Sequence, residues 1–102
     1  MQEIANHQLS LDQIPDPNAE DWSWFDFAHT FNGFEAAGSF EACSAIAKRI
    51  RADGSGSLSE LRCTLFLTAR ALRHCGWDGP TPDSVRHLLR EIRKKVASGD
   101  LD

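Results

Sequence analysis

Glycines divide this chain into four segments, and each segment before a glycine carries helix signals. Four of the seven glycines follow these segments directly or after one residue: Gly33, Gly54, Gly76 and Gly99. A glycine just past a helix can adopt the left-handed conformation that ends the helix. We therefore predict four helices, over residues 17–32, 40–52, 58–75 and 82–98.

Start signals precede the same four segments. Ser, Thr and Asp accept hydrogen bonds from the free N–H groups of a first helical turn, and proline suits the first helical position. Ser57 and Glu60 also have the spacing of a capping box. The predicted caps are Asp16 (before Pro17), Ser39, Ser57 and Thr81 (before Pro82).

Apolar side chains recur at helical spacing in all four segments. The segment 58–75 is apolar over most of its circumference, which predicts a central helix. Phe40 opens the predicted apolar face of the segment 40–52. The first segment holds five aromatics in ten residues, some of them expected in the core and others at an interface: Trp22, Trp24, Phe25, Phe27 and Phe31.

The fold expected from these signals is an all-α, compact four-helix domain over residues 16–102. The connections are short, which favours antiparallel neighbours, and 102 residues suit one domain. Residues 1–15 lack helical periodicity and predict a short flexible N-terminal arm.

Composition indicates a cytoplasmic protein. There is no long apolar run to cross a membrane, and residues 1–15 do not resemble a signal peptide. The cysteines number three, without CxxC spacing, which favours a reducing compartment. Core packing is the expected role of Cys43, Cys63 and Cys75.

Charge is segregated between the two halves of the chain. Residues 1–47 hold eight acidic residues and no lysine or arginine, whereas residues 48–102 hold all 11 basic residues and seven acids. Such asymmetry either points to a charged partner or reflects two halves that neutralise each other.

No motif predicts catalysis, a metal or a cofactor. The run Asp53–Leu58 resembles part of a calcium loop, but Arg51 and Arg62 would occupy liganding positions. Phosphate-loop spacing is absent, and the Gly-Ser linker is too loose for a helix-turn-helix. Asp26 and His29 share a predicted helix face, and His74 precedes Cys75, yet neither pair has the further ligands that a metal needs.

The stretches WFDFAHTFNGFEAAGSFEACSAIA and SLSELRCTLFLTARALRHCG resemble a group of small bacterial proteins of uncharacterised function. The resemblance covers about residues 22–92 and implies a shared helical fold, without implying catalytic residues. Small accessory proteins of this kind often come from phage or mobile elements, where inhibitors and immunity proteins are common.

The preferred functional hypothesis is a non-enzymatic protein-binding module. It would inhibit a bacterial defence nuclease complex, as an anti-CRISPR protein does, with an acidic surface that competes with nucleic acid. A toxin immunity protein is an alternative. The predicted partner-binding residues are Asp12, Asp16, Glu20, Asp21, Trp22, Asp26 and Glu35.

A second alternative is a nucleic-acid-binding regulator that uses the last helix. Basic side chains line the predicted outer face of that helix and could bind phosphates. The acidic net charge of −4 weighs against this alternative. The candidate nucleic-acid face consists of Arg86, Arg90, Arg93, Lys94 and Lys95.

Overall fold

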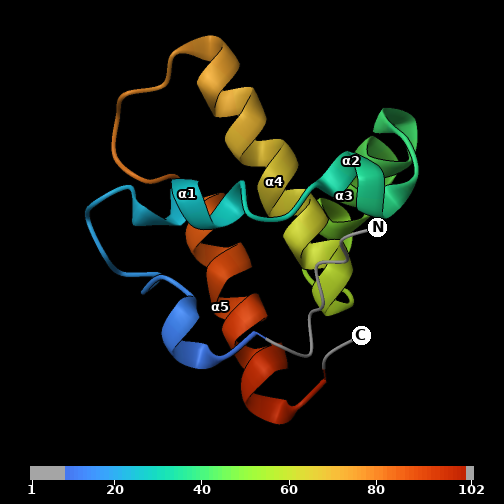
Figure 1. Cartoon of the computed structure of the whole chain (residues 1–102). Coiled ribbons are helices and arrows are strands. Elements are labelled where there is room, and N and C mark those ends of the chain that lie inside the picture. The colour runs from blue at the N-terminus through green and yellow to red at the C-terminus, as the bar shows by residue number, and fades with distance from the viewer. Residues whose placement is uncertain (1–8, 101–102) are drawn as a thin grey trace.

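The computed structural model describes residues 9–100, which form helices and no strand (Figure 1). None of the helices in this range has the length and apolar character needed to cross a membrane. The elements are a 3-10 helix η2 (Leu11–Gln13) and the α-helices α1 (Ser23–Ala28), α2 (Gly33–Ala37), α3 (Phe40–Asp53), α4 (Leu58–Cys75) and α5 (Asp83–Ser98).

Helix α4 is central, as its apolar circumference predicts. It packs against α1, α2, α3 and α5, and Leu61, Leu65 and Ala69 on it are almost completely buried. The main core joins α1, α3, α4 and α5, and Trp24 lies in it. A smaller core cluster, built on Phe31, lies among α2, α3 and α4.

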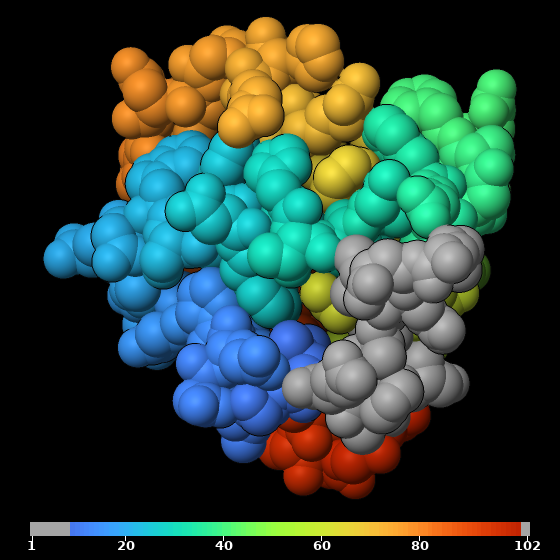
Figure 2. Space-filling model, viewed as in Figure 1, coloured from blue at the N-terminus to red at the C-terminus, as the bar shows by residue number. Residues whose placement is uncertain are grey.

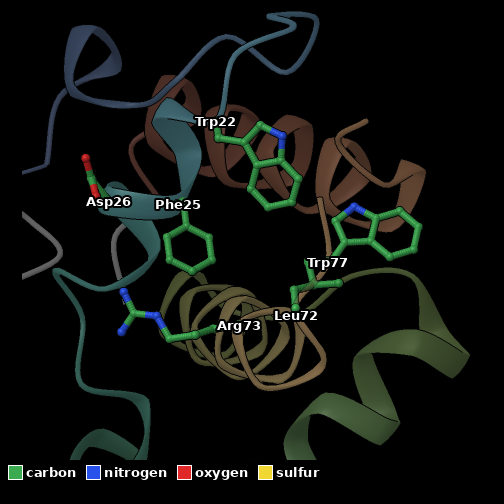
Figure 3. A pocket seen from close by; sticks show the side chains of 7 residues that line it. Trp22, Phe25, Asp26, Leu72, Arg73 and Trp77 are labelled. Atoms are coloured by element: carbon green, nitrogen blue, oxygen red, sulfur yellow. The ribbon is translucent and has the colours of Figure 1, made fainter. Parts of the chain in front are cut away.

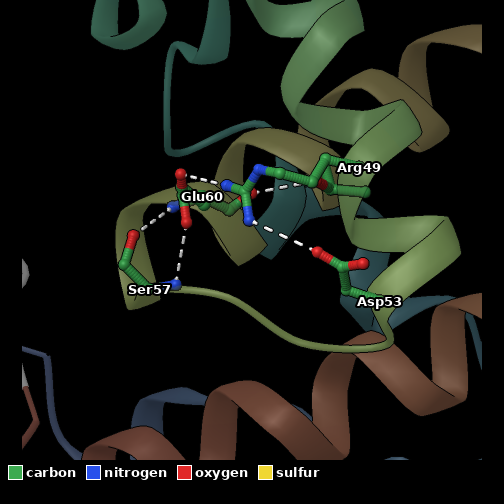
Figure 4. A network of polar contacts seen from close by, with 5 residues as sticks. Arg49, Asp53, Ser57 and Glu60 are labelled. Carbon is green, nitrogen blue, oxygen red and sulfur yellow. Dashed lines mark hydrogen bonds and ion pairs between the residues drawn. The ribbon is translucent and has the colours of Figure 1, made fainter.

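The three longer helices end at the predicted glycines, and α3 and α4 also begin at the predicted caps. Ser39 Oγ accepts from the Ala42 N–H at the start of α3, and Ser57 and Glu60 form the complete capping box of α4. Arg49 on α3 pairs with Glu60, so the same carboxylate caps α4 and joins it to α3 (Figure 4). Gly54, Gly76 and Gly99 all have the left-handed conformation expected after a helix.

The predicted helix over residues 17–32 is wrong, because local side-chain bonds break it up. Asp16 Oδ1 accepts from the Asn18 N–H in a turn instead of capping a helix. Asn32 Oδ1 accepts from the Glu35 N–H and thereby caps α2. Gly33 begins α2 rather than ending a helix, and a Cβ there would lie 2.8 Å from the Phe66 ring. Residues 9–100 therefore form five α-helices instead of the predicted four, and α1 and α2 are short.

Three smaller predictions also need correction. Cys75, expected in the core, is exposed at the end of α4. Pro82, not Thr81, occupies the cap position of α5, and Thr81 is buried without capping the helix. Phe40 does not face the core: its side chain is 54% exposed and contacts the Phe34 ring edge-to-face.

Part of the predicted arm is docked on the domain. Residues 1–8 lie outside the described residues, but residues 9–15 lie against α5. Ile14 is buried in the main core, and Leu9 packs against that core. The segment after residue 8 is thus part of the folded domain.

Candidate protein-binding groove

An open groove of about 420 Å³ lies between α1 and the C-terminal end of α4. Trp22 and Trp77 flank it, Leu72 lies below the gap between the two indoles, and Phe25 lies on the side of Trp22 away from Trp77 (Figure 3). Asp26 and Arg73 lie on the other side of Phe25 from the indoles. We call this feature the tryptophan groove; its lining residues are Trp22, Phe25, Asp26, Leu72, Arg73, Gly76 and Trp77.

The end of α4 positions Trp77. Gly76 takes the left-handed conformation, so the chain turns and the Trp77 N–H donates to the Leu72 carbonyl at 3.0 Å. The indole Nε1 donates to the Pro80 carbonyl at 3.0 Å, and the ring lies against Gly79, where a Cβ would be 3.1 Å away. Trp77 is therefore held in place while 45% of it remains exposed.

The opposite wall of the groove is formed at the start of α1, where the half-buried ring of Trp22 packs against the buried ring of Trp24. Trp24 is 2% exposed, whereas Trp22 and Phe25 are half-buried. The Trp22 ring lies 5.2 Å from the Trp24 ring and 6.0 Å from the Phe25 ring, centroid to centroid. The Arg73 guanidinium lies 5.2 Å from the Phe25 ring centroid, a distance for cation–π attraction. The wall is thus ordered before any partner binds.

One acidic residue, Asp26, lines the groove, and two more precede Trp22 in the sequence. Glu20 and Asp21 immediately precede Trp22 and are exposed, as is Asp26. Asp21 Oδ1 accepts from the Ser23 hydroxyl and N–H, and these bonds lower the pKa of Asp21 below its usual value. Figure 2 shows that residues 9–39, which include no lysine or arginine, form much of one face of the molecule.

The other predicted partner-binding residues lie apart from the groove. Asp12 is in η2, and its carboxylate accepts from Ser10 Oγ, which lowers the pKa of Asp12. Asp16 lines a different open cleft, next to Arg90 and Arg93. Glu35 is in the first turn of α2. The groove brings together Trp22 and Asp26, with Glu20 and Asp21 next in sequence to Trp22.

Two arginines of the predicted nucleic-acid face hold the N-terminal segment instead of facing solvent freely. Arg86 Nη1 donates to the Pro17 carbonyl at 2.9 Å, and Arg93 Nη1 donates to the Ile14 carbonyl at 3.0 Å. Lys94 pairs with Glu91, and Lys95 pairs with Asp100. Arg90 is exposed. Much of this basic surface is therefore engaged within the domain.

The role of Arg93 predicts a stability effect. Arg93→Ala is expected to lower the free energy of unfolding by about 1–2 kcal/mol, because a charge-assisted hydrogen bond to a part-buried carbonyl is lost. Arg90→Ala, one helical turn away and exposed, is the matched control and should change it by less than about 0.5 kcal/mol. Urea unfolding measures both, and equal effects would contradict the assigned contact.

Among the described residues, His29 lies between aromatic rings and not in a cluster of metal-ligating side chains. The described residues contain no group of three or more His, Cys, Asp or Glu side chains placed to hold a metal ion. His29 lies between the rings of Phe25, at 4.8 Å, and Phe66, at 5.6 Å. Its buried Nε2 has no hydrogen-bond partner among the described residues. Packing between rings therefore accounts for His29.

His29 predicts a loss of stability at acid pH. Burial lowers the pKa of His29, the charges of Arg73 and Arg70 lower it further, and Asp26 opposes them. The unfolded chain therefore takes up a proton more readily than the folded one, and stability should fall as the pH drops below about 6.5. His29→Gln should flatten this slope between pH 7.5 and 5. Urea midpoints test this, and an unchanged slope in His29→Gln would contradict it.

Sequence reasoning missed Trp77, Leu72 and Arg73 as groove residues. A signal was present for Trp77, since the run Gly76–Pro80 contains two glycines and a proline and offers no helical face to bury an indole. Comparisons with protein-family models, with curated proteins and with solved structures find no match to this chain.

Proposed function

We propose that this chain is a non-enzymatic protein-binding domain that docks through the tryptophan groove. Its partner is a basic, nucleic-acid-binding surface of a bacterial defence nuclease complex, which the chain inhibits as an anti-CRISPR protein does. The observation that supports this most is the pairing of Trp22 and Trp77 across a preformed groove beside an acid-only segment.

The two indoles, of Trp22 and Trp77, anchor the partner. Trp77 leaves 45% of its surface exposed although three contacts already fix its position. Tryptophan is enriched among the residues that dominate binding energy at protein interfaces. Because both walls are ordered, a partner side chain that enters the groove buries apolar surface at little entropic cost.

The acidic side chains favour a basic partner surface. Residues 1–47 carry eight acids without a single lysine or arginine. Asp26 lines the groove, and the exposed Glu20 and Asp21 immediately precede Trp22. A channel that binds nucleic acid is basic, so such a face complements it and competes with phosphates for the same cations. Association should therefore weaken as salt rises.

Direct nucleic-acid binding by α5 is less well supported. Arg86 and Arg93 hold backbone carbonyls of the N-terminal segment, and both lysines of the candidate face have acidic partners. We expect no shift of duplex DNA by the wild-type protein in a gel at low salt. A shift that Arg90→Ala abolishes would favour the regulator instead.

The test is inhibition of DNA cleavage by purified bacterial defence nuclease complexes. We expect the wild type to inhibit at least one complex, and Glu20→Lys/Asp21→Lys to abolish that inhibition. Asp53→Lys/Asp83→Lys changes the charge equally at exposed acids outside both the groove and residues 1–47, and should still inhibit. The proposal fails if no complex is inhibited, or if the two double variants inhibit equally.

A further inference from the structure

A pair of buried thiols joins α3 to α4 in the smaller core cluster. Cys43 on α3 is 0% exposed and Cys63 on α4 is 2% exposed. Their Sγ atoms lie 2.7 Å apart, closer than non-bonded sulfur atoms normally stand. Phe31 is the third buried member of this cluster, and Phe34 and Ile46 pack against it.

We propose that Cys43 and Cys63 are an oxidative modification site that forms an intramolecular disulfide when the protein meets a peroxide. A disulfide requires a sulfur–sulfur distance of about 2.05 Å, so the two atoms need to approach by only about 0.7 Å. The pairing was not evident from the sequence, because 19 residues separate the two cysteines.

The chemistry balances with hydrogen peroxide as the oxidant. The thiolate of one cysteine attacks the peroxide O–O bond, which gives a sulfenic acid and releases one water after proton transfer. The second thiol then attacks the sulfenic sulfur, the S–O bond breaks, and a second water leaves. Two thiols lose two electrons and two protons in total, and one peroxide is reduced to two waters.

Burial sets the rate and the selectivity of this step. Burial raises the pKa of the Cys63 thiol, and the adjacent Cys43 thiol raises it further. The thiolate is therefore scarce, and oxidation should be slow and need sustained peroxide. Cys75 is exposed at the end of α4 and lies outside the cluster, so it cannot replace either partner in the folded chain.

The disulfide would alter two elements at once. It would close a loop through the α3–α4 connection, which stabilises the folded state by restricting the unfolded chain. It would also remove the thiol proton that Cys63 Sγ donates to the Gly33 carbonyl, 3.5 Å away at the first residue of α2. The oxidised protein would be more resistant to heat but would lack this contact to α2.

The test treats the folded full-length chain with hydrogen peroxide and maps the products. Trypsin separates the three cysteines into peptides 1–48, 63–70 and 74–86. We expect Cys75→Ser protein to lose 2 Da and to yield peptide 1–48 linked to peptide 63–70, both reversed by dithiothreitol. Its melting temperature should rise by roughly 10 °C on oxidation. Cys43→Ala protein should show neither change.

Wild-type protein provides the internal control, because its exposed Cys75 reports that the oxidant is active. After peroxide treatment, the protein is unfolded and its remaining free thiols are alkylated with N-ethylmaleimide. The proposal is overturned if Cys75 is oxidised while Cys43 and Cys63 are still reduced and become fully alkylated. It is also overturned if the linked peptides contain Cys75 instead of this pair, or if oxidation lowers the melting temperature of Cys75→Ser protein.

Discussion

Trp24→Ala is expected to lower the free energy of unfolding by about 3–5 kcal/mol. Trp24 is 2% exposed and belongs to the core cluster that joins α1, α3, α4 and α5. Its ring also lies 5.2 Å from the Trp22 ring and 5.5 Å from the Phe25 ring, so truncation leaves a cavity directly beneath the groove wall. Urea or guanidinium unfolding, followed by circular dichroism, measures the loss.

Trp22→Ala is the matched control, since it removes the same side chain two residues away. Trp22 is only half-buried at the groove, so its loss should cost clearly less than the loss of Trp24. Trp22→Ala should weaken partner binding more than Trp24→Ala does, when binding is calculated per folded molecule. Equal destabilisation by the two substitutions would contradict the division between a buried and a partner-facing tryptophan.

Trp77→Ala is expected to weaken binding of the inhibited nuclease complex by roughly 30-fold or more, the effect of losing about 2 kcal/mol at an interface anchor. Stability should change little, because Trp77 is exposed in the connection between α4 and α5. Biolayer interferometry with the immobilised chain gives the dissociation constant, and thermal unfolding gives the stability.

Phe40→Ala provides the control for that prediction. Phe40 is 54% exposed, and it lies at the start of α3, outside the residues that line the tryptophan groove. Its truncation removes an exposed ring without touching the groove and should leave the dissociation constant within about two-fold. If Phe40→Ala weakened binding as much as Trp77→Ala, exposed aromatic surface in general, and not the groove, would account for binding.

Helices whose signals agree could be predicted from the sequence. For α4, the Ser57–Glu60 capping box, the apolar stripe and Gly76 all mark the same boundaries, and the structure has the predicted residues 58–75. Helix α3 likewise begins after Ser39 and ends before Gly54. In both helices, local cap chemistry and core packing favour the same conformation.

The region before α3 could not be predicted in the same way, because its signals compete. The aromatics of α1 follow helical spacing, but Asp16, Asp21 and Asn32 accept hydrogen bonds from nearby backbone N–H groups. These local bonds divide the predicted helix into turns, α1 and α2. Gly33 illustrates the ambiguity: a glycine after a helical pattern predicts an end, but here close contact with Phe66 requires it.

Only part of the candidate site could be predicted from the sequence. Contacts between residues far apart in the chain decide which charged side chains remain free to bind a partner. Trp22 and its neighbouring acids could be selected from composition alone. The engagement of Arg86 and Arg93 could not, since each binds a backbone carbonyl far away in sequence, of Pro17 and Ile14. The groove itself exists because the chain turns after Gly76 and places Trp77 across from Trp22.

The most direct test of the tryptophan groove is quantitative affinity capture from bacteria that carry a defence nuclease complex inhibited by the wild type. Wild-type and Phe40→Ala protein should retain the complex equally, and high salt should release it. Trp22→Ala/Trp77→Ala protein, shown to be folded by circular dichroism, should lose at least nine-tenths of the captured complex. Capture of the same amount by the folded double variant would contradict the assignment of this groove as the binding surface.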